Sequence, residues 1–162
     1  MARSRTTRLN ETSTQAPSQS EPRNLVSVIA PTYNRSSLLI GASDSVWAQT
    51  YRPIELIIVD DGSTDNTRMA AEAWQPEYRG DNYFTLEYVV QENRGPAVAR
   101  NRGLVLARGE YVRFLASDDR LHPEKLAVQA SVLDRAPQLD AVVARVAFLD
   151  AMRRNGWISE MP

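Results

Sequence analysis

Short apolar segments alternate with segments of helical periodicity along most of this chain, and this alternation limits the fold more than any other feature. The strand-like segments cover residues 25–30, 54–60, 85–91, 110–116 and 140–150. Nearly continuous apolar strands are typical of strands that are buried on both faces. With helices between them, they predict an α/β fold in which a mostly parallel sheet is flanked by helices. Pro31 is expected to end the first strand, because proline lacks the backbone N–H that a sheet uses.

Four helices are expected between and after these strands, at about 38–46, 69–74, 96–106 and 124–135. Ser36 or Ser37 would cap the first helix, and Thr64 or Asp65 the second. The third and fourth each begin at a proline, which is tolerated in the first turn of a helix. Gly103 lies inside the third helix and weakens that prediction, since glycine disfavours helix interiors.

The first 24 residues differ in composition from the rest of the chain. They are rich in Ser, Thr, Arg, Gln and Pro, and Leu9 is the only large aliphatic side chain after Met1. Such a segment buries too little apolar surface to offset its ordering entropy, so residues 1–24 are predicted to form a disordered tail. The other residues, 25–162, are predicted to form one domain, and the 43% hydrophobic content of the 162-residue chain is sufficient for a core.

The composition excludes several classes of site and partner. The chain has no cysteine, which excludes disulfides and thiolate zinc sites, and its single histidine argues against a histidine-rich metal site. A formal charge of −1 gives no reason to expect nucleic acid as a partner. No apolar segment approaches the roughly 20 residues that span a bilayer, and the N-terminus lacks the apolar core of a signal peptide. The expected location is the cytoplasm, or the inner face of the membrane.

Polar residues follow three of the predicted strands. They lie at 31–34, 60–64 and 117–119, in the segments PTYN, DDGST and SDD. If the strands are parallel, these segments meet at one rim of the sheet, which is where ligands bind in open α/β folds. Taken singly, the second segment could be a turn with a helix cap, and the third a solvated turn. Their convergence favours a binding site.

The residue types at this rim indicate its ligand. Asp118 and Asp119 are adjacent like charges, and carboxylates without histidine or thiolate favour a hard cation such as Mg²⁺ or Mn²⁺. Two carboxylates are too few to cage the ion, so it would bring water and a phosphate-bearing substrate. Tyr33 could pack against a nucleobase. Arg94 and Arg100 lie near a helix start, where anions are favoured, although both could be surface charges. The pattern predicts a metal-bound nucleotide diphosphate.

Five segments also resemble a known family, in sequence and in order. They are VSVIAPTYNR, ELIIVDDGSTDNT, ENRGPAVARNRGL, GEYVRFLASDD and HPEKL. From about residue 25 to residue 156 the chain is similar to family 2 glycosyltransferases of the GT-A fold. The resemblance implies a Rossmann-like GT-A domain and an inverting transferase. Such an enzyme moves a sugar from a nucleotide diphosphate, expected here to be UDP- or dTDP-linked, to an acceptor hydroxyl.

The resemblance also implies roles for single residues in holding the donor. Pro31 and Tyr33 would border the nucleobase, and Asp61 would accept a hydrogen bond from a base N–H. Arg100 would approach the base or the diphosphate. The acceptor stays open, since glycan, lipid-linked and protein acceptors all occur in such a family.

The acid pair would complete this donor site. Asp118 would contact the ribose or sugar, and Asp119 would bind Mn²⁺ or Mg²⁺, which bridges the diphosphate as a Lewis acid. Ala116 stands where many members carry the first acid of a D-x-D-D motif. Members with a small residue there retain the last two acids, so metal binding is still expected.

The family's general base, an Asp or Glu that deprotonates the acceptor, is expected several tens of residues beyond the acid pair, past Pro162. The chain would therefore hold the donor half and lack most of the acceptor half. A non-catalytic nucleotide-sugar binding module is the alternative function. A receiver-type signalling domain is a third, although its acid pair would follow the first strand. An unpaired sheet edge could also make the chain self-associate.

Overall fold

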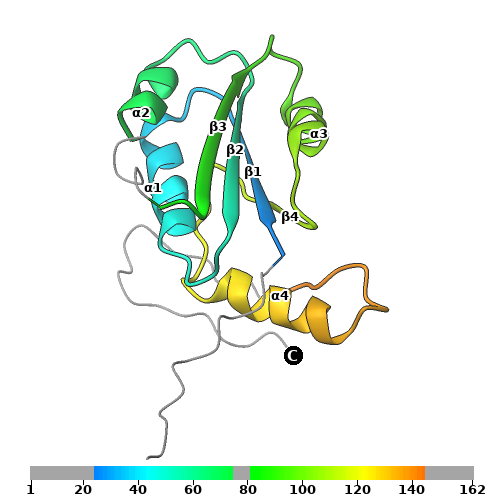
Figure 1. The fold of residues 1–162 in the computed structure, drawn as a ribbon. Helices are drawn as coiled ribbons and strands as arrows, with labels where there is room; N and C mark the ends of the chain where they lie inside the picture. Colours follow the sequence, from blue (N-terminus) through cyan, green and yellow to red (C-terminus); the bar gives the residue numbers. More distant parts are fainter. Residues whose placement is uncertain (1–23, 75–80, 145–162) are drawn as a thin grey trace, which may run out of the picture.

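The computed structural model describes residues 24–74 and 81–144. In them, four parallel strands form one sheet with the order β3-β2-β1-β4 (Figure 1). The strands are β1 (Val26–Thr32), β2 (Ile54–Asp60), β3 (Phe84–Val90) and β4 (Tyr111–Phe114). The helices are α1 (Ser36–Trp47), α2 (Thr67–Trp74), α3 (Pro96–Leu106) and α4 (Lys125–Arg135). The predicted fold class, a parallel sheet flanked by helices, is confirmed.

Helices cover both faces of this sheet, with α1 and α2 on one face and α3 on the other (Figure 1). Successive residues of a strand point to opposite faces. Val28 therefore belongs to the larger core with Leu39 of α1, whereas its neighbour Ile29 packs with Ala99 of α3 in a smaller one. Both central strands, β1 and β2, are buried along their whole length, which explains their continuous apolar sequences.

Gly103 allows α3 to lie close to β1. A Cβ atom at this position would lie 2.3 Å from Ile29 Cγ2, far closer than carbon atoms can approach without strain. The glycine that weakens the helix in sequence terms is therefore the residue that fits α3 onto the sheet.

Pro31 lies inside β1, so the prediction that it ends the strand is wrong. It opposes Val59 of β2, whereas the register of β1 with β4 ends at Ile29. The N–H and C=O groups of one strand residue point to one neighbouring strand, and those of the next residue point to the other. The Thr32 carbonyl accepts the Asp61 N–H, so Thr32 points toward β2 and Pro31 toward β4. The side on which Pro31 lacks an N–H thus faces the stretch where β4 has already ended, and the sheet loses no hydrogen bond.

The start of α1 also differs from the prediction. Ser36 is already helical and the preceding residue, Arg35, makes no side-chain cap, so neither Ser36 nor Ser37 caps this helix. A carboxylate from another loop takes this role, because Asp65 Oδ2 accepts the Ser36 N–H at 3.4 Å. Asp65 Oδ1 accepts the N–H of Thr67, the first residue of α2, at 2.9 Å. Of the two candidates for the second cap, Asp65 is therefore the correct one.

The end of the sheet where β1 and β2 begin is closed by α4 (Figure 1) and by a buried carboxylate. Glu55 of β2 is only 2% exposed, and its Oε1 accepts hydrogen bonds from Ser27 Oγ at 2.5 Å and from the Arg108 N–H at 2.6 Å. Its Oε2 pairs with the Arg108 guanidinium at 2.9 Å. Burial acts to raise the pKa of Glu55, but these hydrogen bonds outweigh it and hold the pKa below its ordinary value. Glu55 thereby ties β1 and β2 to the segment before β4.

Several predictions fall partly outside the described residues. The disordered tail at 1–24 does so except for its last residue. Of the strand predicted at 140–150, only residues 140–144 are described, and they have no regular secondary structure. Within 24–74 and 81–144, no helix is long and apolar enough to cross a membrane.

Candidate functional site

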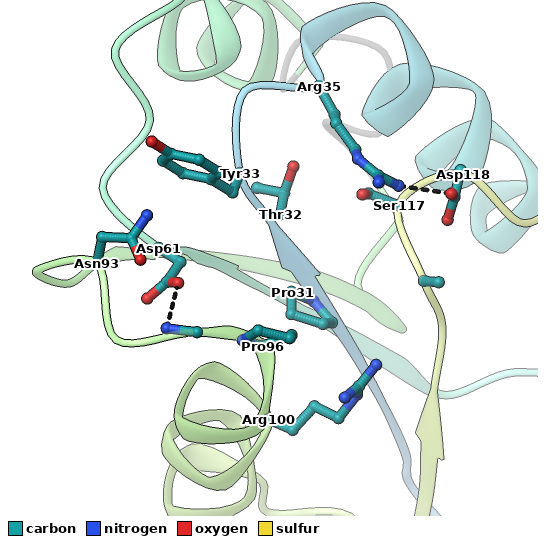
Figure 2. A pocket seen from close by; sticks show the side chains of 12 residues that line it. Pro31, Thr32, Tyr33, Arg35, Asp61, Asn93, Pro96, Arg100, Ser117 and Asp118 are labelled. Atoms are coloured by element: carbon teal, nitrogen blue, oxygen red, sulfur yellow. Dashed lines mark hydrogen bonds and ion pairs between the residues drawn. The ribbon is translucent and has the colours of Figure 1, made fainter.

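A hollow of about 500 Å³ lies at the rim of the sheet, where β1, β2 and β4 end (Figure 2). Its lining residues are Pro31, Thr32, Tyr33, Arg35, Asp61, Asn93, Gly95, Pro96, Arg100, Ala116, Ser117 and Asp118. Five of the six residues predicted for a donor site are among them, namely Pro31, Tyr33, Asp61, Arg100 and Asp118. Asp119, the sixth, follows Asp118 directly but does not line the hollow. Segments far apart in sequence thus meet here, because parallel strands end at one rim.

Asn34 holds two loops of this rim together. Its Oδ1 accepts the N–H groups of Thr64 at 2.7 Å and of Asp65 at 3.3 Å, and its own N–H donates to Ser63 Oγ at 2.9 Å. Asn34 adopts a φ of 51°, a left-handed conformation that asparagine tolerates better than most residues. Sequence reasoning gave Asn34 no role, although a polar residue of this type after a strand is the usual signal of such a turn.

Asp61 is held by three donors from the loop that precedes α3. Its Oδ1 accepts the Gln91 side-chain amide at 2.7 Å and the Arg94 N–H at 2.9 Å, and its Oδ2 accepts the Gly95 N–H at 2.8 Å. Burial acts to raise the pKa of Asp61, but the three hydrogen bonds outweigh it and lower the pKa. A carboxylate has about four lone-pair sites, so Asp61 can accept one further hydrogen bond on Oδ2.

Asp60, which directly precedes Asp61 in the DDGST segment, stabilises the fold. It is 2% exposed, and its two oxygens accept hydrogen bonds from the Ser63 N–H and the Tyr88 hydroxyl. Burial and the bond to Asp60 raise the pKa of Tyr88, so its hydroxyl stays a donor. Both oxygens of Asp60 are engaged away from the hollow, so Asp61 is the acid of the two that faces the hollow.

Arg35 and Asp118 face each other across the upper wall of the hollow (Figure 2), with Arg35 Nη1 2.5 Å from Asp118 Oδ2. The turn that presents the acids is closed by a hydrogen bond from the Asp119 N–H to the Ala116 carbonyl at 3.0 Å. No group of three or more acidic or histidine side chains gathers for a metal in the described part of the chain. A cation here would need oxygen ligands from water and from its substrate. Arg35 was missed from the sequence, because its partner lies 83 residues away.

The two arginines near α3 differ in position. Arg100 projects toward the hollow (Figure 2) and has no ion pair within the described residues. The Arg94 side chain lies outside the hollow, with its guanidinium 3.7 Å from Glu92. Arg94 contributes to the site through its backbone N–H, which donates to Asp61. Of the two arginines predicted near an anion, only the Arg100 side chain lines the hollow.

Thr32 adds a polar group that sequence reasoning did not single out. The residue is 4% exposed, and its hydroxyl has no hydrogen-bond partner among the described residues. It lies in the wall of the hollow between Tyr33 and Ser117 (Figure 2).

A parallel sheet flanked by helices, with carboxylates and Arg100 around a hollow at its carboxyl rim, is an α/β domain of the Rossmann-like type. The sequence profile described as "Glycosyl transferase family 2" matches residues 27–161. The chain therefore belongs to glycosyl transferase family 2, as its motifs indicated. The sheet and its helices are the Rossmann-like GT-A arrangement expected from the sequence.

Named relatives are similar to this chain over part of their length. The putative teichuronic acid biosynthesis glycosyltransferase TuaG of Bacillus subtilis is 43% identical over 105 residues, which are 65% of this chain and 40% of TuaG. S. aureus TarS 1-349 in complex with UDP-GlcNAc matches with a TM-score of 0.62 and 33% identity, over 69% of this chain and 32% of that one. The mannosyltransferase PcManGT of Pyrobaculum calidifontis, solved with GDP-Man and Mn²⁺, matches with a TM-score of 0.61 and 31% identity, over 72% and 33%.

The matched region covers between 17% and 40% of the length of each of eight curated relatives.

Proposed function

We propose that the hollow binds a nucleotide-diphosphate sugar, UDP- or dTDP-linked, as the donor for an inverting transfer to an acceptor hydroxyl. The observation that carries this proposal is the meeting of Pro31, Tyr33, Asp61, Arg100 and Asp118 in one hollow of about 500 Å³. Ligand pockets of small molecules and cofactors occupy roughly 300–1,000 Å³, so the volume suits such a donor.

Each wall of the hollow matches one part of the donor. Tyr33 is 45% exposed, which leaves its ring free to lie against a nucleobase beside Pro31. Asp61 has one acceptor site left for a base N–H. Arg100 carries a charge without a carboxylate partner in the described residues, and a diphosphate would provide one.

The acid pair fits a divalent cation. The guanidinium of Arg35 lies against Asp118, so positive charge is favoured at this position. The resemblance gives the cation to Asp119 and the ribose or sugar to Asp118. We assign Asp119 to hold Mn²⁺ or Mg²⁺ and extend the assignment by letting Asp118 share the cation, which when bound supplies a Lewis acid that stabilises charge on the leaving diphosphate. Support comes from PcManGT, which was solved with Mn²⁺.

The donor base and sugar are supported only by analogy. TarS was solved with UDP-GlcNAc and PcManGT with GDP-Man, so the two neighbours differ in base. The name of TuaG refers to teichuronic acid biosynthesis, which supports a glycan acceptor.

The donor assignment can be tested by thermal unfolding with UDP, dTDP and GDP and their sugars, with and without Mn²⁺. A ligand that binds only the folded state raises the unfolding temperature. We expect one nucleotide series to stabilise the chain in the presence of Mn²⁺, and Asp119→Ala to abolish the Mn²⁺-dependent part. Glu110→Ala, which removes an exposed carboxylate away from the hollow, should behave as the wild type. A chain that no nucleotide stabilises would contradict the donor site.

A binding module without transferase activity is the alternative. Asp61 and Asp118 are the only carboxylates that line the hollow in the described residues, and both are already engaged. Neither suits a general base, which must be within reach of the acceptor hydroxyl. If this alternative holds, we expect the 162-residue chain to bind the donor and to transfer little or no sugar. Turnover at a rate typical of enzymes, about 1 s⁻¹ or more, would rule out the binding-only function.

A further inference from the structure

The contact between Arg35 and Asp118 joins two walls of the proposed donor site. Arg35 directly precedes α1, and Asp118 follows β4. Both side chains line the hollow and both are about half exposed, at 46% and 48%. Figure 2 places the guanidinium above the hollow, between the β1–α1 loop and the acidic turn. The pair therefore occupies the region where the sugar and metal parts of a donor would lie.

The backbone of Arg35 is held more firmly than its guanidinium group. The Arg35 N–H donates to Thr67 Oγ1 at 3.2 Å, and Asn34 ties the adjacent residue to the loop after β2. The side-chain ion pair is different, because half-exposed pairs contribute only about 0–1 kcal/mol. The loop thus fixes the backbone from which the Arg35 side chain extends, while the guanidinium can exchange its partner at low cost.

Two interactions would favour the separation of Arg35 from Asp118. A divalent cation attracts Asp118 more strongly than a single guanidinium does, because it carries twice the charge. A guanidinium displaced from a carboxylate binds phosphate oxygens well, because its planar donors match two of them at once. A metal-bound diphosphate offers both changes in one step.

We propose that Arg35 is a positioning residue that competes with the divalent cation for Asp118 and, once displaced, binds a phosphate of the donor. The proposal rests on the proposed function of the hollow. The proposal makes binding of the two ligands cooperative. The metal alone must displace Arg35 from Asp118 and leaves the guanidinium without a new partner, whereas the metal with a diphosphate gives the guanidinium a phosphate to bind. By linkage, Mn²⁺ then strengthens nucleotide binding by the same factor as the nucleotide strengthens Mn²⁺ binding.

Calorimetric titrations of the 162-residue chain with Mn²⁺ alone, UDP or GDP alone, and the nucleotide with Mn²⁺ test this inference. In Arg35→Gln, we expect Mn²⁺ alone to bind several-fold more tightly, because its competitor is gone. We expect the nucleotide with Mn²⁺ to bind about tenfold more weakly, because a charge-assisted phosphate contact is lost. Arg35→Lys keeps the charge but not the planar donors, so its Mn²⁺ affinity should stay near that of the wild type while nucleotide binding falls.

Arg68→Gln is the matched control. It removes an arginine from an exposed pair with Glu72, outside the hollow, and should leave all three affinities unchanged. An Arg35→Gln variant that keeps every wild-type affinity, or that loses affinity for Mn²⁺ and nucleotide alike, overturns the inference. Thermal unfolding of each variant identifies a loss of affinity that is due to misfolding. If Arg35→Gln misfolds, the affinities of Arg35→Lys for Mn²⁺ and nucleotide test the inference instead. A wild-type chain that binds no nucleotide would instead contradict the proposed function, and this inference with it.

Discussion

At the scale of single residues, the rim is built from side chains that form hydrogen bonds to neighbouring loops as well as lining the hollow. Asp61 holds the loop before α3 with three hydrogen bonds and keeps one acceptor site free. Asn34 joins the loops after β1 and β2. The geometry of the hollow therefore depends on polar contacts between loops.

Substitution of Asn34 tests this dependence. Asn34→Ala removes the acceptor of two backbone N–H groups and puts alanine, which tolerates the left-handed region less well than asparagine, at a φ of 51°. We expect the free energy of unfolding to fall by about 2–3 kcal/mol, as measured by urea denaturation. Asn34→Gly loses the same hydrogen bonds but adopts this φ freely, so its loss should be about 1 kcal/mol smaller. Wild-type stability in both variants would contradict the role of Asn34.

Sequence reasoning found the residues that line the hollow better than the residues that hold its loops together. Tyr33, Asp61 and Asp118 follow strands and Pro31 lies near the end of one, and the rule that parallel strands end at one rim was sufficient to bring them together. The partners of Asn34 and Arg35 lie about 30 and 83 residues away. No local pattern indicates such a pair, because both depend on how two loops approach in space.

At the scale of elements, the four described strands and four described helices were predictable, but the group that caps α1 and the role of Pro31 in β1 were not. β2 was predicted with its observed bounds, because a buried parallel strand needs a continuous apolar sequence. The cap of α1 was not predictable, since Asp65 of another loop supplies the acceptor. Pro31 was misplaced for a related reason: whether proline ends a strand depends on the extent of the neighbouring strand.

The packing of α3 on the sheet gives a prediction at this scale. Gly103→Ala would place Cβ at 2.3 Å from Ile29 Cγ2. We expect a net loss of about 1–3 kcal/mol of stability in urea denaturation, despite the gain of about 1 kcal/mol that alanine gives a helix interior.

Gly41→Ala in α1 is the control for this substitution. The atoms nearest to its Cβ would be those at the end of the Arg120 side chain, which can move aside. Stability should stay unchanged or rise by up to about 1 kcal/mol. An equal effect of the two substitutions would mean that the Gly103 contact does not limit the approach of α3.

At the scale of the whole molecule, the two ends of the sheet have different tasks. The carboxyl rim carries the hollow, whereas Glu55 and α4 close the opposite end. The Glu55 cluster involves no residue that lines the hollow. Stability and donor binding should therefore be separable by mutation.

Glu55→Gln tests this separation through its pH dependence. The folded pKa of Glu55 is lowered, so the charged form contributes stability above its ordinary pKa of 4.5. That contribution is lost as the pH falls below this value and through the lower folded pKa. We expect Glu55→Gln to be about 2 kcal/mol less stable at pH 7, with a difference that shrinks below about pH 4.5 in urea denaturation. Nucleotide affinity at pH 7 should stay that of the wild type.

Glu110→Gln, at an exposed carboxylate, should lose no stability at either pH. A constant difference between Glu55→Gln and the wild type across this range would indicate that the carboxylate is not charged in the folded state.

The hydrogen bonds on Asp61 have a consequence for the choice of nucleobase. They keep this carboxylate ionised, and an ionised carboxylate accepts hydrogen bonds but cannot donate them. Uracil, thymine and guanine each present a ring N–H on their Watson–Crick edge, whereas cytosine and adenine present a lone pair at the equivalent ring nitrogen. A hollow that reads the base through Asp61 would therefore favour the first three, whereas cytosine and adenine could donate to Asp61 through their exocyclic amino groups, with the ring lone pair beside the carboxylate. CDP- and ADP-linked sugars would thus be disfavoured before any contact with the sugar is made.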